Sequence, residues 1–265
     1  MSEDASPGTE WFHAHFGLIV TGRGERQFLP KLFNDLQRSG ACFFEVVRRV
    51  EQLRPITSTN RKLRIAGKSL PTRDEEIGLI ARRYLSRGAH KYVVLIDDLE
   101  YDWRQQIDEV FARYRNAFDA VLGPYREDAS VHFLVNMLEA YYFADSQAVT
   151  DALELTPPFS EYNGDVEQIR NPKSELRQQL LAYTIAFDEI EHGDKIVSRL
   201  RLERILGNPE SCGSLRTLVA WCVERLQDHP HFPNTDWNQT FQLNSGRLST
   251  PTRTQLQTRK YESTQ

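Results

Sequence analysis

The first 145 residues alternate between short runs of consecutive apolar residues and longer segments in which apolar residues recur at helical spacing. Apolar runs bounded by turn residues predict strands at residues 16–20, 41–47, 91–96 and 130–136. Apolar positions three or four residues apart predict helices at residues 28–36, 74–86 and 103–121. Because strands that alternate with helices form βαβ units, we predict an α/β fold with a mostly parallel sheet flanked by helices.

Beyond residue 145 the pattern changes to helical segments separated by loops that contain Pro and Gly. These segments are predicted at residues 147–155, 173–183, 195–206 and 215–226. After His229-Pro230 the chain is poor in aliphatic residues and rich in Asn, Gln, Thr and Ser, which is typical of flexible segments. We therefore expect four parts: a flexible N-terminus (1–14), an α/β domain (15–145), a helical C-terminal portion packed on it (146–229) and a flexible polar tail (230–265).

The composition is that of an ordinary globular protein, with 40% hydrophobic and 26% charged residues. No window approaches the ~18 consecutive apolar residues that a membrane-spanning helix needs, so we expect no membrane insertion. Cys42, Cys212 and Cys222 form neither a CxxC pair nor a disulfide framework, which favours a reducing cytoplasm. With a net charge of −4, any basic surface for nucleic acid must be local.

Acidic residues follow two of the predicted strands at the point where each strand ends. The first strand leads into the turn TGRG (21–24) and then Glu25, and the third leads into Asp97, Asp98 and Glu100. In a parallel sheet ligands bind outside the carboxyl ends of the strands, so these side chains are expected to share a cleft. Clustered carboxylates are usually kept ionised by a hard divalent cation, which points to Mg²⁺ or Mn²⁺ and to metal-assisted phosphoryl chemistry.

Each part of this pattern also has a purely structural interpretation. An acid in the first turn of a helix, such as Glu25, is stabilised by the helix dipole without any function. Asp97 and Asp98 are also suited to capping the next helix and its turn. The TGRG turn is not followed by GKT or GKS, so it is not a P-loop, although Thr21 and the backbone N–H groups up to Gly24 could cradle a phosphate.

A local basic segment lies between the second predicted strand and the next helix. Residues 48–73 contain eight Lys or Arg against one Glu, in a chain that is acidic overall. Such a segment suits contacts with nucleic-acid phosphates, and the alternative is a solvated loop. The residues expected to contact nucleic acid are Thr21, Arg23, Arg61, Lys62, Arg64 and Lys68.

Three stretches, GLIVTGRGERQFLPKLF (17–33), YVVLIDDLE (92–100) and HFLVNMLEAYYFAD (132–145), together resemble the Toprim fold. The resemblance covers roughly residues 15–225 and is to small bacterial Toprim-like proteins related to overcoming-lysogenization-defect nucleases and to abortive-infection components. These proteins show a Glu-Gly-x-x-Glu motif, an Asp-x-Asp motif, a Glu-Ala-(aromatic)-x-x-Ala-Asp motif and an Asn-Pro-Lys motif. The matching residues here are Gly22, Glu25, Glu139, Ala140, Ala144, Asp145, Asn171, Pro172 and Lys173.

The resemblance implies that a glutamate handles proton transfer while the Asp-x-Asp carboxylates hold Mg²⁺ against a phosphodiester. The chain departs from this pattern, because Thr21 stands where the leading glutamate is expected and Asp-x-Asp is replaced by Asp97-Asp98-Leu99-Glu100. Either Glu25 or Glu100 then substitutes for the missing acid, or the site binds without cutting. Glu139 is a candidate additional metal ligand, and the alternative is an acid on the surface of a helix.

The sequence therefore leads to one main functional hypothesis and two alternatives. The resemblance implies a cytoplasmic, Mg²⁺-dependent nuclease or nuclease-derived effector subunit in phage defence that acts on phosphodiesters of DNA or RNA, with DNA favoured. It also implies an ATP-binding-cassette-type ATPase as a partner and a homodimer as an oligomeric state. The alternatives are a catalytically degenerate scaffold subunit with the same fold, which Thr21 favours, and an enzyme that acts on small phosphorylated molecules.

Overall fold

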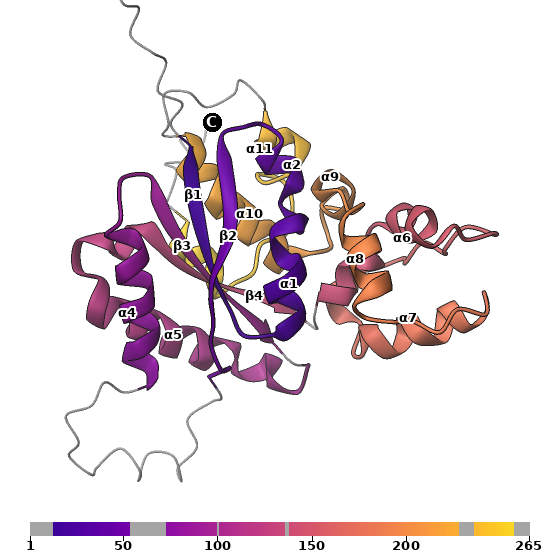
Figure 1. The fold of residues 1–265 in the computed structure, drawn as a ribbon, viewed down its shortest axis with the longest axis horizontal. Coiled ribbons are helices and arrows are strands. Elements are labelled where there is room, and N and C mark those ends of the chain that lie inside the picture. The colour runs from indigo at the N-terminus through magenta and orange to yellow at the C-terminus, as the bar shows by residue number, and fades with distance from the viewer. Residues whose placement is uncertain (1–12, 54–72, 100, 136–137, 228–235, 257–265) are drawn as a thin grey trace, which may run out of the picture.

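A central sheet of four parallel strands organises the molecule (Figure 1). The computed structural model describes residues 13–53, 73–99, 101–135, 138–227 and 236–256. The strands are β1 (Ala14–Val20), β2 (Cys42–Arg49), β3 (Lys91–Leu99) and β4 (Ala129–Val135), in the spatial order β2-β1-β3-β4. All three neighbouring pairs are parallel. The predicted α/β class with a parallel sheet flanked by helices is therefore confirmed.

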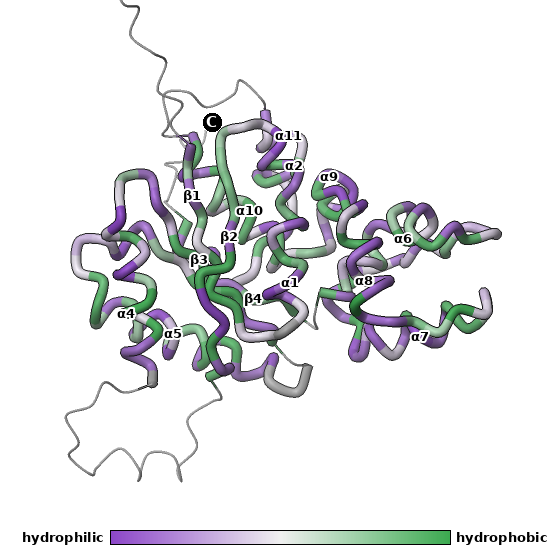
Figure 2. Tube along the Cα trace, viewed as in Figure 1, coloured by the Kyte–Doolittle hydropathy of each residue, from purple (hydrophilic) through white to green (hydrophobic). Residues whose placement is uncertain are grey.

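Helices cover both faces of the sheet because its strands are apolar on both sides. One face packs against α1 (Arg23–Leu32), α2 (Asn34–Gln37) and α10 (Gly213–Gln227), and the other against α4 (Arg73–Leu85) and α5 (Ile107–Leu122). Side chains on one strand alternate between the two cores: Leu18 and Val20 lie in the first, and Ile19 lies in the second. Figure 2 shows hydrophobic residues gathered along the central strands.

The helical portion of the chain forms a lobe beside the sheet and then returns to it (Figure 1). The lobe contains α6 (Ser146–Leu153), α7 (Pro172–Leu181), α8 (Glu191–Val197) and α9 (Leu202–Ile205). In α10, Trp221 meets the rings of Phe16 and Tyr92 edge-on, with centroids 6.3 and 6.2 Å apart. The lobe and the first face of the sheet therefore share one continuous core.

Short 3-10 helices complete the connections between these elements. They are η2 (Tyr101–Gln106), η3 (Gly123–Asp128), η4 (Leu138–Tyr142), η5 (Val166–Gln168) and η6 (Thr252–Gln255). The predicted helix at 103–121 is thus divided into η2 and α5. Similarly, the predicted helix at 195–206 is divided into the end of α8 and the separate α9.

The prediction of a flexible tail over residues 230–265 is wrong for residues 236–256. This segment contains α11 (Trp237–Thr240) and buries the side chains of Trp237, Phe241 and Leu243 in the main core. Its Gln255 side chain accepts a hydrogen bond from the backbone N–H of Val131 at 2.9 Å and donates one to the same residue's carbonyl at 2.7 Å. The amide thus occupies the outer edge of β4, which would otherwise present unpaired backbone groups.

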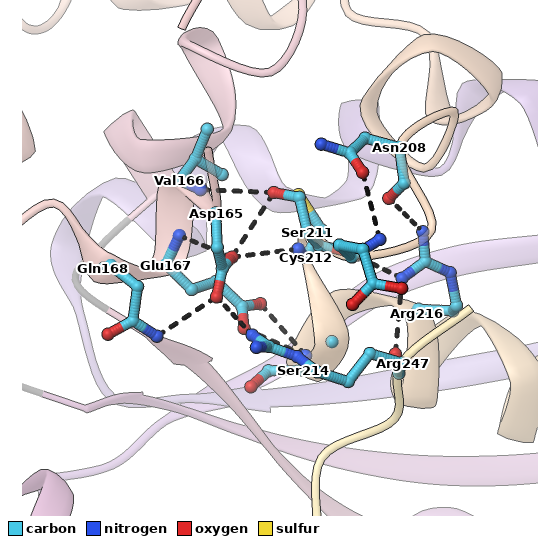
Figure 3. Close-up of polar contacts among 12 residues, drawn as sticks. Asp165, Val166, Glu167, Gln168, Asn208, Ser211, Cys212, Ser214, Arg216 and Arg247 are labelled. Atoms are coloured by element: carbon cyan, nitrogen blue, oxygen red, sulfur yellow. Dashed lines mark hydrogen bonds and ion pairs between the residues drawn. The ribbon is translucent and has the colours of Figure 1, made fainter. Parts of the chain in front are cut away.

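A buried polar cluster joins the lobe to the start of α10 (Figure 3). Glu167 of η5 accepts hydrogen bonds from the backbone N–H groups of Ser214 and Leu215 at 3.0 and 3.3 Å, at the N-terminal end of α10. Arg216 is fully buried and donates to five backbone carbonyls. These carbonyls belong to Leu206, Asn208, Pro209, Ser211 and Arg247.

The three cysteines are buried and unpaired, and burial raises the pKa of the Cys42 thiol to about 12. Such thiols are inert rather than nucleophilic, because the thiolate is the reactive form. Across the described helices, none combines the length and the apolar character that crossing a membrane requires.

Candidate functional site

Thr21 joins the carboxyl ends of β1 and β3. Val20, the last residue of β1, pairs with Ile96, so Thr21 lies level with the acidic pair of β3. The Thr21 hydroxyl donates to Asp97 Oδ1 at 2.9 Å and accepts from the backbone N–H of Asp98 at 3.1 Å. A threonine cannot act as a general base, and here it holds the two strand ends together.

The two aspartates of β3 have different surroundings. Asp97 is fully buried, and its charge acts on the hydroxyl of Tyr114 in α5, which accepts a hydrogen bond from the backbone N–H of Leu53 at 2.9 Å. Burial, and then the charge of Asp97, raise the pKa of the Tyr114 phenol. Asp98 is partly exposed and, by strand alternation, belongs to the opposite face, the one that α1 covers. The two aspartate side chains are therefore directed to opposite faces of the sheet, although the charge of Asp97 still acts on Glu25.

Glu25 is a buried acid in the first turn of α1. Its side chain is 4% exposed and folds back over Gly22, so that a Cβ on that glycine would lie 1.6 Å from Glu25 Oε2. Oε2 has no hydrogen-bond partner among the described residues. Burial raises the pKa of Glu25, and the negative charges of Glu139 and Asp97 add to this effect, which Lys173 opposes. The carboxyl group therefore keeps its proton to a higher pH than an ordinary glutamate.

Glu139 is not the surface acid that one interpretation of the sequence expected. It lies in η4, is 6% exposed, and pairs with Lys173 of α7, whose Nζ is 3.3 Å from Glu139 Oε1. Nζ is also 2.8 Å from Glu189 Oε2. Burial raises the pKa of Glu139, an effect that Lys173 opposes. Burial acts to lower the pKa of Lys173, but the hydrogen bond to Glu189 and the charge of Glu139 outweigh it and raise that pKa.

The acidic cleft, defined as Glu25, Asp97, Glu139, Lys173 and Glu189, thus contains one lysine among four carboxyl groups. Sequence reasoning singled out its first three acids, and the Asn-Pro-Lys match pointed to Lys173 without assigning it a role. Glu189 was missed, since it follows α7 in a stretch without helical spacing.

Two aromatic residues beside the cleft behave as predicted. Tyr141 and Tyr142 were interpreted as core residues, and both are buried, as is Leu138. The negative charges of Glu139 and Glu189 add to burial in raising the pKa of the Tyr142 phenol. Asp145, in contrast, accepts from the backbone N–H of Ala148 at 3.1 Å and caps α6, which gives it a structural role.

Several predicted site residues lie outside the described residues. These are Glu100, Arg61, Lys62, Arg64 and Lys68, together with the side chain of Arg23. Among the residues that are described, no group of three or more His, Cys, Asp or Glu is arranged to hold a metal ion. The donors of the cleft are nevertheless the hard oxygens that Mg²⁺ prefers, and Mg²⁺ is commonly bound by one or two carboxylates plus substrate phosphates.

Comparison with known proteins gives one match. The model of the family described as Domain of unknown function (DUF4276) matches residues 20–220, which is more than half of the chain. The matched range includes every described member of the acidic cleft and extends through most of α10. Neither the curated proteins nor the solved structures gave a significant match. The chain belongs to the DUF4276 family.

Proposed function

We propose that this protein is a Toprim-like, Mg²⁺-dependent nuclease, or the nuclease-derived effector subunit of a larger complex, acting on phosphodiesters of DNA. One observation carries the proposal: Glu25 and Glu139, buried acids from separate elements, lie close enough for their charges to interact, and Asp97 at the carboxyl edge of the parallel sheet, where such folds bind ligands, acts on Glu25 in the same way. Buried like charges with raised pKa values are typical of functional sites.

Within this proposal the acids, Lys173 and the basic residues have different tasks. The residues that would hold Mg²⁺ together with phosphate oxygens of the substrate are Asp98 and Glu25, with Glu139 and, outside the described residues, Glu100 as further candidates, and the metal when bound would polarise the phosphodiester. Glu25 handles the proton at Oε2, the oxygen without a hydrogen-bond partner among the described residues. Lys173 keeps Glu139 and Glu189 in place. The basic residues Arg61, Lys62, Arg64 and Lys68 contact the phosphate backbone, as do Thr21 and Arg23 at the turn.

The wider setting of the proposal rests on the resemblance to Toprim-like defence proteins. It comprises the cytoplasm, a role in phage defence or abortive infection, an ATP-binding-cassette-type ATPase as partner, and a homodimer. Buried, unpaired cysteines are compatible with a reducing compartment.

A second candidate function is a degenerate scaffold subunit, and the geometry of Thr21 favours it. The residue that stands in place of the leading glutamate makes two hydrogen bonds that join β1 to β3, which is a structural task. In that case the acidic cleft would bind without cutting.

Two glycine variants test the proposal at the position of Glu25. Gly22→Ala places a methyl group on the Glu25 carboxylate, whereas a Cβ at Gly24 meets nothing nearer than Glu189 Oε1 at 3.7 Å. Both variants, with wild type and Asp98→Asn, are assayed for cleavage of plasmid and single-stranded DNA and of RNA. Each assay contains Mg²⁺ or Mn²⁺ and is run with and without the ATP-binding-cassette-type ATPase proposed as the partner.

The nuclease proposal predicts a clear order of activities. Displacing the carboxylate by about 1 Å or more should reduce cleavage by about 100-fold in Gly22→Ala, whereas Gly24→Ala should cleave like wild type. Asp98→Asn should lose metal-dependent cleavage. Absence of cleavage in all four proteins, with the ATPase complex still assembling, would favour the scaffold instead.

A further inference from the structure

A second pocket lies at the opposite end of the sheet from the acidic cleft. It has a volume of about 310 Å³ and is formed by α5, η3, α10 and η6. Ala129, the first residue of β4, lies in its wall, whereas Asp98 pairs with Leu134 near the last residue of that strand. We call it the Arg225 pocket, and its polar lining includes Arg115, Asp119, Arg126 and Arg225.

Two of the three arginines in this pocket are fully engaged with one aspartate. Arg115 donates to Asp119 Oδ1 from Nε at 2.8 Å and from Nη2 at 2.6 Å. Arg126 donates to both oxygens of Asp119, at 2.7 and 2.6 Å. The hydrogen bonds from both guanidinium groups hold the pKa of Asp119 below its usual value, although burial opposes them. These three residues form a closed structural unit in the wall.

Arg225 lines the same pocket, but no carboxylate of the described residues pairs with its guanidinium group. Its side chain lies over the ring of Trp221, 5.1 Å from the centroid, and the residue is only 5% exposed. Its Nε is buried and has no hydrogen-bond partner among the described residues. Asp128 is close enough to interact with this charge electrostatically but forms no ion pair with it within the described part of the chain. A buried charge without a hydrogen-bonded partner is costly, so Arg225 requires an explanation.

We propose that the Arg225 pocket binds a small oxyanion, a carboxylate or phosphate group, through the Arg225 guanidinium. The flat fork of this side chain is held against Trp221 and is suited to two parallel hydrogen bonds with such a group. Glu127 also lines the pocket, and Asp128 lies nearby, so these acids disfavour a polyanion such as nucleic acid. The occupant is therefore a small ligand with one anionic group, and the pocket is a site separate from the acidic cleft.

Binding of two simple probes to the full chain tests this proposal. Inorganic phosphate and acetate are titrated separately at constant ionic strength, with chloride as the balancing ion, and the heat of binding is measured. The variant Arg225→Met removes the guanidinium, and Arg177→Met is the control, because Arg177 is an exposed arginine on α7. A preference for phosphate or for acetate identifies which oxyanion the pocket takes.

We expect wild type and Arg177→Met to bind one of the probes alike, and Arg225→Met to bind it at least about tenfold more weakly. Without any probe, Arg225→Met should melt about 2–4 °C higher than wild type, because it removes an uncompensated buried charge. If that variant does not fold, Arg225→Lys keeps the charge but loses the fork, and it should bind several-fold more weakly. The proposal is overturned if wild type binds neither probe, or if the folded variant binds as wild type does.

Discussion

Replacing Arg216 of α10 by Met should destabilise the protein more than replacing an arginine of the lobe. The fully buried guanidinium donates to five backbone carbonyls, at distances from 2.6 to 3.3 Å, and so ties the loop before α10 to the segment around Arg247. Gly246 packs directly on it: a Cβ there would lie 2.3 Å from Arg216 Nε. Burial lowers the pKa of Arg216, which shows that desolvation of its charge is only partly offset.

The size of the effect follows from these contacts. Each lost hydrogen bond has a net cost of about 1 kcal/mol, and carbonyls left without a donor in the interior cost more. Methionine recovers part of this by filling the volume of the arginine stem and by removing a buried charge. The expected loss in free energy of unfolding is therefore about 3–5 kcal/mol. Arg204→Met is the matched control, since Arg204 is about half exposed and makes one long contact of 3.4 Å with Asp145. Its cost should stay below about 1 kcal/mol.

Urea denaturation followed by far-UV circular dichroism measures the difference. With a slope of about 3 kcal/mol per molar urea, the midpoint should fall by about 1–1.7 M in Arg216→Met and by less than about 0.3 M in Arg204→Met. Gly246→Ala should also lower the midpoint, because the pinned guanidinium cannot move away from the added methyl group. Equal midpoints for Arg216→Met and Arg204→Met would refute the view that the polar cluster holds the lobe to α10.

Three further predictions concern protonation and the edge of the sheet. Because the pKa of Glu25 is raised above its ordinary 4.5, the stability it contributes is present below pH 4.5 and lost as the pH rises through the raised value. Glu25→Gln should therefore melt higher than wild type at pH 8 and like wild type at pH 4. Burial lowers the pKa of His132 to about 3. The stability that the neutral histidine contributes is therefore lost as the pH falls from 6.5 toward 3, by up to about 1.4 kcal/mol per pH unit. His132→Leu should show a flatter profile of melting temperature against pH in this window. Gln255→Ala removes both hydrogen bonds to Val131 and should cost about 1–2 kcal/mol, measured by urea titration, with faster amide hydrogen exchange at Val131.

The alternation of apolar runs was enough to predict the class of fold and the approximate position of each strand. The predicted strand at 91–96 nevertheless ended too early, because β3 continues through Asp97 and Asp98 to Leu99. Asp97 and Asp98 were expected to follow the strand end, where they could also cap the next helix, yet the extended backbone includes both. Because residues in one strand alternate between faces, the side chains of the two aspartates are directed to opposite faces of the sheet.

The parts that the sequence did not predict depend on contacts between distant residues. The segment 236–256 contains only a few widely spaced apolar residues, so its composition resembles that of a flexible tail, although Trp237 and Phe241 anchor it in the main core. The pairing of Lys173 with Glu189 joins residues on either side of a loop after α7. The burial of Glu139 arises because η4 is a short 3-10 helix packed in the core, whereas a surface helix would have exposed it.

The surroundings of the two aspartates separate the nuclease proposal from the scaffold proposal. Asp97 accepts a hydrogen bond from Thr21 and is fully buried, so Asp97→Asn should lower stability under either proposal. Asp98 is partly exposed on the face that α1 covers, so Asp98→Asn should leave stability nearly unchanged and affect only a reaction at the carboxyl edge of the sheet. A fold that served assembly alone would gain nothing from burying Glu25 and Glu139 with raised pKa values, because burial of such acids costs stability. That cost is the strongest physical reason to expect chemistry at the carboxyl edge of β3.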